Sequence, residues 1–278
     1  MKNILKIMLM MITIFTIAGS AVYAAEIPVS DQDQLITSRD WTEISNLQDE
    51  MKKEEPDATI DYDKALKVYV DCNLIKLQTA DTKKLTSALE SANYVWVIPF
   101  KMEKTYGMFT VAKGLPLSEE AKSVLTKAEQ EEVKNHAGKW MITETAEHTV
   151  EPYYDILLEK REALSDCTRV VLVGSQPGMR QPVALGMDDE TARIWISLGY
   201  QYPVMKKIPE TQNVESGVYS FDSVAEISDT YIEDSEVSTG AGVQSRSSMK
   251  YVAGIGIIVI GSILILSVLK KKKLEDYE

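Results

Sequence analysis

The sequence predicts an α+β domain: an antiparallel sheet of hairpins and meanders with packed helices, followed by one C-terminal transmembrane helix. Short segments rich in Val, Ile and aromatic residues follow one another with few residues between them, which favours antiparallel pairing because parallel strands need long crossovers. Helical patterns interrupt these segments without a regular strand–helix alternation, as is typical of α+β folds. Near the C-terminus stands an uncharged apolar run, Tyr251–Leu269.

Two hydrophobic segments predict where the chain is located. Met1–Ala24 has a basic start, an apolar centre and small residues at its end, the pattern of a signal peptide, with an uncleaved anchor as the alternative. Tyr251–Leu269 has nearly the length of about 20 residues that a spanning helix needs. Lys270–Lys273 follow it, and such lysines mark the cytoplasmic flank. We therefore expect a single-pass cell-membrane protein with its N-terminal domain extracytoplasmic and its C-terminus cytoplasmic.

The composition then divides the chain into consecutive parts. Low hydrophobicity and high charge near the C-terminal side predict a flexible tether, in which only Val218–Ile227 has the pattern of a strand. The expected parts are a signal peptide (1–24), a polar segment with an amphipathic helix (25–60), an extracytoplasmic α+β domain (61–203), an acidic tether (204–250), the transmembrane helix (251–269) and a short cytoplasmic tail (270–278).

The first elements follow from capping and periodicity. Asp40, with Glu43 three residues later, predicts a capped helix that ends before Pro56. In residues 66–72, apolar side chains alternate with Lys67, Tyr69 and Asp71, so we expect a half-buried strand with these three on its other face.

The middle of the chain predicts two helices and a hairpin. Asp81 begins a helix, and Tyr94–Lys101 with Tyr106–Ala112 form the hairpin. Ser118 caps a helix that runs to Gly138. The expected inward stripe of that helix is Ala121, Val124, Leu125, Ala128 and Val133.

The last part of the predicted domain contains one helix and a meander. Pro152 opens a helix that extends through Leu164. Three strands follow with short connections, Arg169–Val173, Pro182–Met187 and Ala192–Leu198.

Charge and cysteine content restrict the function. The chain has 30 basic and 42 acidic residues, a formal net charge of −12, which argues against nucleic acid as a partner. Cys72 and Cys167 are the only cysteines, and an oxidising compartment permits a disulfide between them. The alternative is a pair of buried, reduced thiols.

No motif predicts a metal, cofactor or catalytic residue. His136 and His148 lack the short spacing of metal ligands. The loop 174–180 contains glycine but lacks the Gly-Lys-Ser/Thr ending of a phosphate loop, so we expect a hairpin loop whose tip, Met179 and Arg180, contacts a partner.

Aromatic residues suggest a second contact surface. Tyr69 and Trp195 fall on the strand faces opposite the aliphatic ones, with Tyr200 and Tyr202 nearby. If exposed, they form a sheet face for binding. Burial is the favoured explanation, because helices are expected to cover part of that side.

The layout of signal peptide, apolar span and terminal lysines resembles that of surface proteins that sortases attach to Gram-positive cell walls. Those proteins carry Leu-Pro-x-Thr-Gly just before the span, where this chain has residues 247–250, Ser-Ser-Met-Lys. Residues 208–212, Ile-Pro-Glu-Thr-Gln, are a near match in the wrong place. The departure indicates a permanent membrane anchor.

These observations support one leading hypothesis and one alternative. We expect a membrane-tethered extracytoplasmic domain that binds a protein or envelope component, its bilayer contact made by Tyr251–Leu269. The alternative is a surface hydrolase that uses the carboxylates of Asp188, Asp189 or Glu190, which requires a cleft that separates their pKa values.

Overall fold

The computed structural model describes residues 27–148, 151–174, 176, 179, 181–200, 202–209 and 213–228. The helices are η1 (Asp31–Asp33), α2 (Trp41–Ser45), α3 (Gln48–Glu54), η2 (Tyr62–Lys64), η3 (Ile75–Leu77), α4 (Thr82–Ser91), α5 (Glu119–Val124), α6 (Lys127–His136), α7 (Tyr153–Glu159) and η4 (Met205–Lys207). The strands are β1 (Thr59–Ile60), β2 (Leu66–Val70), β3 (Asn93–Lys101), β4 (Tyr106–Lys113), β5 (Trp140–His148), β6 (Arg169–Val173), β7 (Val183–Met187), β8 (Ala192–Ser197), β9 (Asn213–Glu215) and β10 (Val218–Ser220). Residues 221–228 are also helical.

A single mixed sheet organises the described residues. Its ten strands run in the order β5-β4-β3-β2-β6-β7-β8-β10-β9, with β1 paired to β3. The predicted hairpin is confirmed as β3–β4, and the predicted meander as β6–β7–β8, all antiparallel. The exception is β2, which pairs with β6 in parallel. The chain is therefore an α+β protein with a mostly antiparallel sheet.

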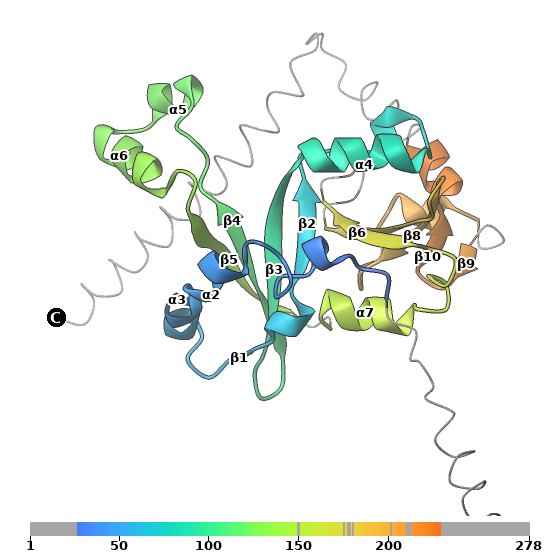
Figure 1. Cartoon of the computed structure of the whole chain (residues 1–278), viewed down its shortest axis with the longest axis horizontal. Coiled ribbons are helices and arrows are strands. Elements are labelled where there is room, and N and C mark those ends of the chain that lie inside the picture. Colours follow the sequence, from blue (N-terminus) through green and yellow to red (C-terminus); the bar gives the residue numbers. More distant parts are fainter. Residues whose placement is uncertain are drawn as a thin grey trace, which may run out of the picture.

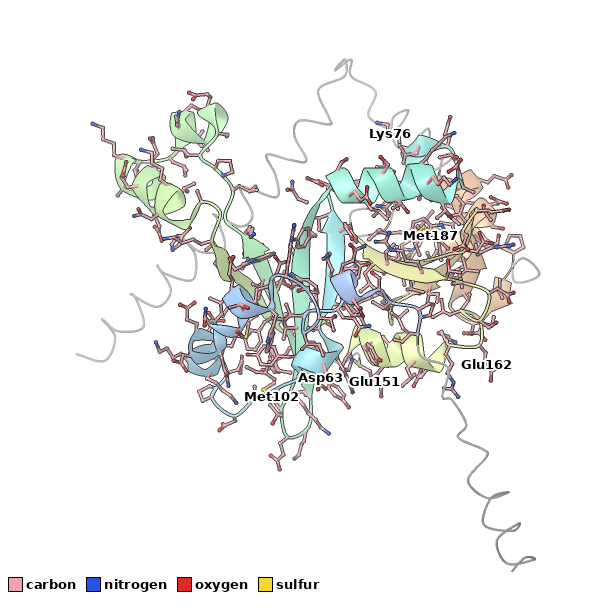
Figure 2. The ribbon with its side chains drawn as sticks, viewed as in Figure 1. Asp63, Lys76, Met102, Glu151, Glu162 and Met187 are labelled. Carbon is pink, nitrogen blue, oxygen red and sulfur yellow. The ribbon has the colours of Figure 1, made fainter. Side chains whose placement is uncertain are left out.

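Both faces of the sheet are covered near its centre (Figure 1). On one face, side chains of α2, α3, α4 and the helical segment 221–228 pack on the strands; on the other, α7 does. β2 is consequently buried on both faces, and the expectation of a half-buried strand is wrong. Met187 of β7 lies inside the fold, whereas Lys76 and Glu162 lie at its periphery (Figure 2).

The folded part extends beyond the expected domain limits in both directions. Upstream, Val29 forms a parallel bridge with Val170, and the side chains of Leu35 and Ile44 are fully buried. Downstream, β10 pairs with β8, so the limit expected at residue 203 falls inside the sheet. The strand pattern of Val218–Ile227 corresponds to β10 and the helical residues 221–228, whereas the polar composition of 204–217 concealed η4 and β9.

The helix expected between Ser118 and Gly138 is two helices, α5 and α6, which project from the ends of β4 and β5 (Figure 1). Thr126 breaks it by forming a capping box with Glu129. The expected inward stripe is wrong: none of α6 is buried, and Val124 is 72% exposed. The apolar spacing is present, but no core lies opposite it.

In the described residues, no helix is both long and apolar enough to cross a membrane. The expected signal peptide and the expected span, Tyr251–Leu269, lie outside these residues.

Candidate functional site

The expected contact surface is largely interior. Tyr69, Trp195, Tyr202 and Met179 are buried. Tyr200 is half-buried, and Arg180 lies outside the described residues. Trp195 stacks on Phe221 with ring centroids 5.7 Å apart, and the hydroxyl of Tyr202 donates to the carbonyl of Pro182 at 2.6 Å. The favoured explanation, burial, thus describes these aromatic residues.

Both cysteines are free, so the candidate disulfide between Cys72 and Cys167 is absent from this structure. The reason is the sheet itself: Cys72 packs with the core on one face and Cys167 with the core on the other. Burial raises the pKa of each thiol to about 11. Such thiols are poor nucleophiles at neutral pH.

The acidic triplet closes a turn rather than a cleft. Asp188 Oδ1 accepts from the backbone N–H groups of Glu190 and Thr191, at 2.8 and 2.6 Å, and Oδ2 pairs with Arg193. These backbone hydrogen bonds, with the Arg193 guanidinium, lower the pKa of Asp188. Asp189 accepts from the hydroxyl of Thr168, and Glu190 is exposed. This geometry gives the hydrolase hypothesis no support.

A buried lysine is the most unusual feature of the described residues. Lys67 on β2 lies opposite Trp96 on β3, and Tyr69 lies opposite Tyr94. Since directly opposite residues share a sheet face, these four side chains form one cluster. Lys67 Nζ is 4.7 Å from the ring centroid of Tyr94, 5.3 Å from that of Trp96 and 5.7 Å from that of Tyr69. We call Lys67 and these three rings the lysine cage.

Asp33 is the ion-pair partner of Lys67 in the cage. Its Oδ1 lies 3.5 Å from Lys67 Nζ and accepts from the Tyr69 hydroxyl at 2.7 Å. Its Oδ2 lies 3.0 Å from Arg169 Nη2 and accepts from the hydroxyl of Ser30 at 2.6 Å. Burial, reinforced by the Asp33 charge, raises the pKa of Tyr69 well above its ordinary value. Asp33 is held in place by η1, whose chain is anchored to β2 through the backbone bond from Leu35 N–H to Ala65.

Asp40 closes the opposite side of the cage. We expected its carboxylate to cap the following helix, but it makes no cap hydrogen bond. Its Oδ2 instead accepts from the hydroxyl of Tyr94 at 2.8 Å and from the indole N–H of Trp96 at 3.1 Å. The buried indole N–H and the half-buried hydroxyl thus compete successfully with the helix terminus, because leaving such donors unpaired costs more than losing a cap.

Desolvation has the largest effect on the pKa of Lys67 in the cage. Lys67 is only 9% exposed, and burial lowers the pKa of its ammonium, while Asp33 and Asp40 oppose that shift. The three aromatic faces also favour the charged form, since each presents negative charge to a cation. Arg169 shares the Asp33 carboxylate, so Asp33 does not fully compensate Lys67.

The cage opens into a cavity of about 420 Å³. Lys67, Tyr69 and Tyr94 line it from the sheet, and the end of α4 contributes Glu90. The remaining wall comes mainly from the segment 31–40. Its size falls in the range of small-molecule sites, roughly 300–1,000 Å³.

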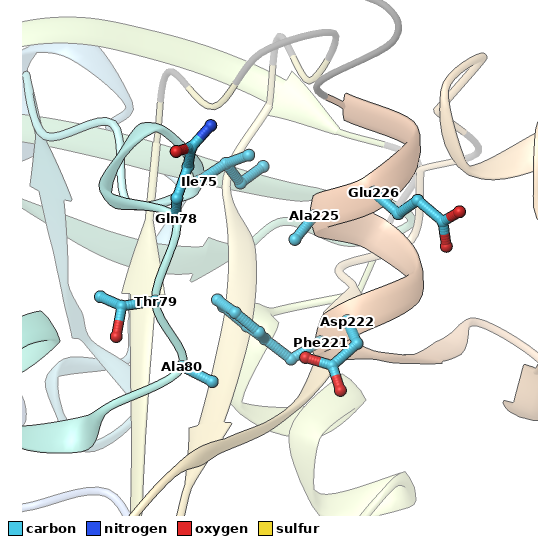
Figure 3. A pocket seen from close by; sticks show the side chains of 8 residues that line it. All are labelled: Ile75, Gln78, Thr79, Ala80, Phe221, Asp222, Ala225 and Glu226. Atoms are coloured by element: carbon cyan, nitrogen blue, oxygen red, sulfur yellow. The ribbon is translucent and has the colours of Figure 1, made fainter.

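A second hollow lies between the loop 75–80 and the helical segment 221–228 (Figure 3). Its volume is about 260 Å³, and Ile75, Ala80, Phe221 and Ala225 contribute apolar atoms to it. Asp222 and Glu226 are its acidic members. Buried charge is absent from this lining, which gives it less capacity for specific recognition than the lysine cage has.

No group of three or more His, Cys, Asp or Glu side chains in the described part is placed to hold a metal ion. Comparison with known proteins gives no relative: no family model matches the chain, and no curated protein or solved structure is significantly similar to it. The cage and its cavity are therefore the candidate site of the described residues.

Proposed function

We propose that this chain is a membrane-tethered extracytoplasmic binding domain, and that its ligand site is the cavity above the lysine cage. The observation that carries the proposal is Lys67, a charged side chain that is only 9% exposed yet lines the larger cavity. Burying an ammonium costs several kcal/mol, so a fold that needs only stability does better with an apolar residue of similar volume. A binding site explains why a charge is retained there.

The tether and the location belong to the same proposal. They are supported by the order of segments in the sequence, an export signal in Met1–Ala24 and a stop-transfer span in Tyr251–Leu269. The free thiols are compatible with export because the sheet separates them.

The test is a ligand screen on the full-length protein in detergent, by thermal shift, against a library of small neutral and charged metabolites. The variant that blocks the cavity is Ala92→Trp, which places an indole there from the end of α4. Its matched control is Ser87→Trp, which adds the same group on the exposed face of the same helix.

We expect at least one compound to raise the melting temperature of the wild type and of Ser87→Trp but not of Ala92→Trp. Stabilisation of all three proteins alike places the ligand elsewhere and rejects the cavity as the site. A library with no stabilising compound rejects a small-molecule binding function.

A further inference from the structure

The charges around the cavity specify what kind of ligand it accepts. At its floor, the Lys67 ammonium carries three N–H donors, and Asp33 is its single ion-pair partner among the described residues. The Asp33 carboxylate is shared with Arg169. One shared carboxylate does not use all three donors, so Lys67, which lines the cavity, retains donor capacity for a ligand.

The rim carries charges of both signs. Arg39, whose side chain is 86% exposed, lies 3.9 Å from the Asp40 carboxylate and lines the opening. Glu90 and Asp31 line it too, and both are exposed. The cavity thus presents cations at Lys67 and Arg39 and carboxylates at Asp31 and Glu90, while the buried Asp40 carboxylate, also in the lining, is engaged by Tyr94 and Trp96.

Neither a simple anion nor a simple cation suits this arrangement. The formal net charge of −12 repels anions at long range. A cation that enters the cavity approaches the Lys67 ammonium in a low-dielectric site, where like charges repel strongly. A net-neutral molecule with separated charges avoids both costs.

We infer that the cavity binds a small zwitterion, the chemical class of amino acids and short peptides, with its carboxylate toward Lys67 and Arg39 and its ammonium toward Glu90 and Asp31. This inference rests on the proposed function, that the cavity is a ligand site. The tyrosine rings of the cage add an apolar wall for the rest of the molecule.

The test is isothermal titration of the full-length protein in detergent with matched triplets: each common amino acid, its N-acetyl form, which is an anion, and its methyl ester, which is a cation. We expect at least one amino acid to bind at least tenfold more tightly than both of its derivatives. Lys67→Met should weaken that binding at least tenfold, and Glu90→Gln several-fold.

Two variants serve as matched controls. Lys76→Met and Glu162→Gln make the same chemical changes at exposed positions away from the cavity and should leave the affinity unchanged. Because Glu90 is exposed, its variant remains informative if Lys67→Met does not fold.

Failure of this inference is distinguishable from failure of the proposed function. Equal or tighter binding of the N-acetyl form or the ester, with loss in Ala92→Trp, overturns the zwitterion but keeps the cavity as a ligand site. Absence of binding by every amino acid also overturns it, and the metabolite screen then decides the function separately.

Discussion

At the scale of single residues, Asp33 determines whether the charges in the core are tolerated. It is almost fully buried and faces Lys67 and Arg169 at once. We expect Asp33→Asn to lower the free energy of unfolding by about 3–5 kcal/mol, because two cations lose their shared anion in a desolvated site. Urea denaturation measures this.

The control for that experiment is Asp31→Asn, two residues away in the same short helix but exposed. Its unfolding curve should overlay that of the wild type. A similar loss for both variants contradicts the assignment of Asp33 as the anion of the cage.

The thiols make a second prediction at this scale. We expect two free thiols per chain after denaturation without reductant, and slow reaction of the native protein with a disulfide reagent near pH 8. Burial raises both pKa values to about 11, so the folded state keeps its thiol protons more tightly than the unfolded one. The contribution of the protonated thiols to the free energy of unfolding is therefore fully present below about pH 8.5, and it is lost as the pH rises through 11.

Denaturation at a series of pH values measures how the free energy of unfolding falls as the thiols ionise. A disulfide found between Cys72 and Cys167 by mass spectrometry contradicts the whole prediction.

Of the candidate site, the sequence singled out only Tyr69, and Lys67 and Asp40 show why the rest was missed. Alternation in 66–72 assigned Lys67 to a polar, open face, since nothing local says that segments 31–40 and 82–91 cover that face. Asp40 has the right neighbours for a helix cap, but its partners Tyr94 and Trp96 lie more than 50 positions away. The pairs Lys67–Trp96 and Tyr69–Tyr94 depend on strand register, which periodicity alone does not give.

At the scale of elements, α6 is the piece most independent of the core. Thr126 and Glu129 satisfy each other's backbone donors at its start. We expect Thr126→Ala to cost about 1 kcal/mol, the usual value for a lost cap. Since none of α6 is buried, the loss should appear as faster amide exchange in 127–136 with an unchanged global unfolding transition.

Amide hydrogen exchange, measured by mass spectrometry on the wild type and on Thr126→Ala, shows whether the loss is local to α6. A global transition lowered by the same amount indicates that α5 and α6 unfold together with the sheet.

Most elements were predictable because their signals are local. Asp81 caps α4 through hydrogen bonds from the N–H groups of Lys83 and Lys84, as its position indicates. The hairpin β3–β4 follows from its short polar turn. The helix expected through Leu164 ends at Glu159, so its predicted C-terminal end is wrong. Leu164 is nevertheless buried, as the apolar pattern predicts.

At the scale of the whole molecule, segments from both ends of the described chain complete the core. The Phe221 ring, just after β10, stacks on Trp195 in the main cluster. We expect Phe221→Ala to lower the free energy of unfolding by about 3–5 kcal/mol, because it leaves a cavity against a fully buried indole.

Asp222→Ala is the neighbouring control, since Asp222 is exposed, and it should change little. Equal stability of Phe221→Ala and wild type in urea contradicts the inclusion of 221–228 in the folded domain.

The proposed anchor gives a prediction for the entire chain. We expect deletion of 251–269 to release the protein from membranes, because these residues are the only long apolar run of the sequence after residue 24. Alkaline extraction of membranes from cells that express each form measures this. Full retention of the deletion variant in the pellet rejects the span as anchor.

The two partners of Asp33 bear on the order in which the protein is made. Asp33 emerges from the ribosome early, but Arg169 follows 136 positions later. At synthesis rates of about 5–20 residues per second, Arg169 is made roughly 7–27 seconds after Asp33. Until β6 has been made, Asp33 can pair with Lys67 but not with Arg169. The buried cluster of Asp33, Lys67 and Arg169 is therefore complete only once most of the folded part has been synthesised.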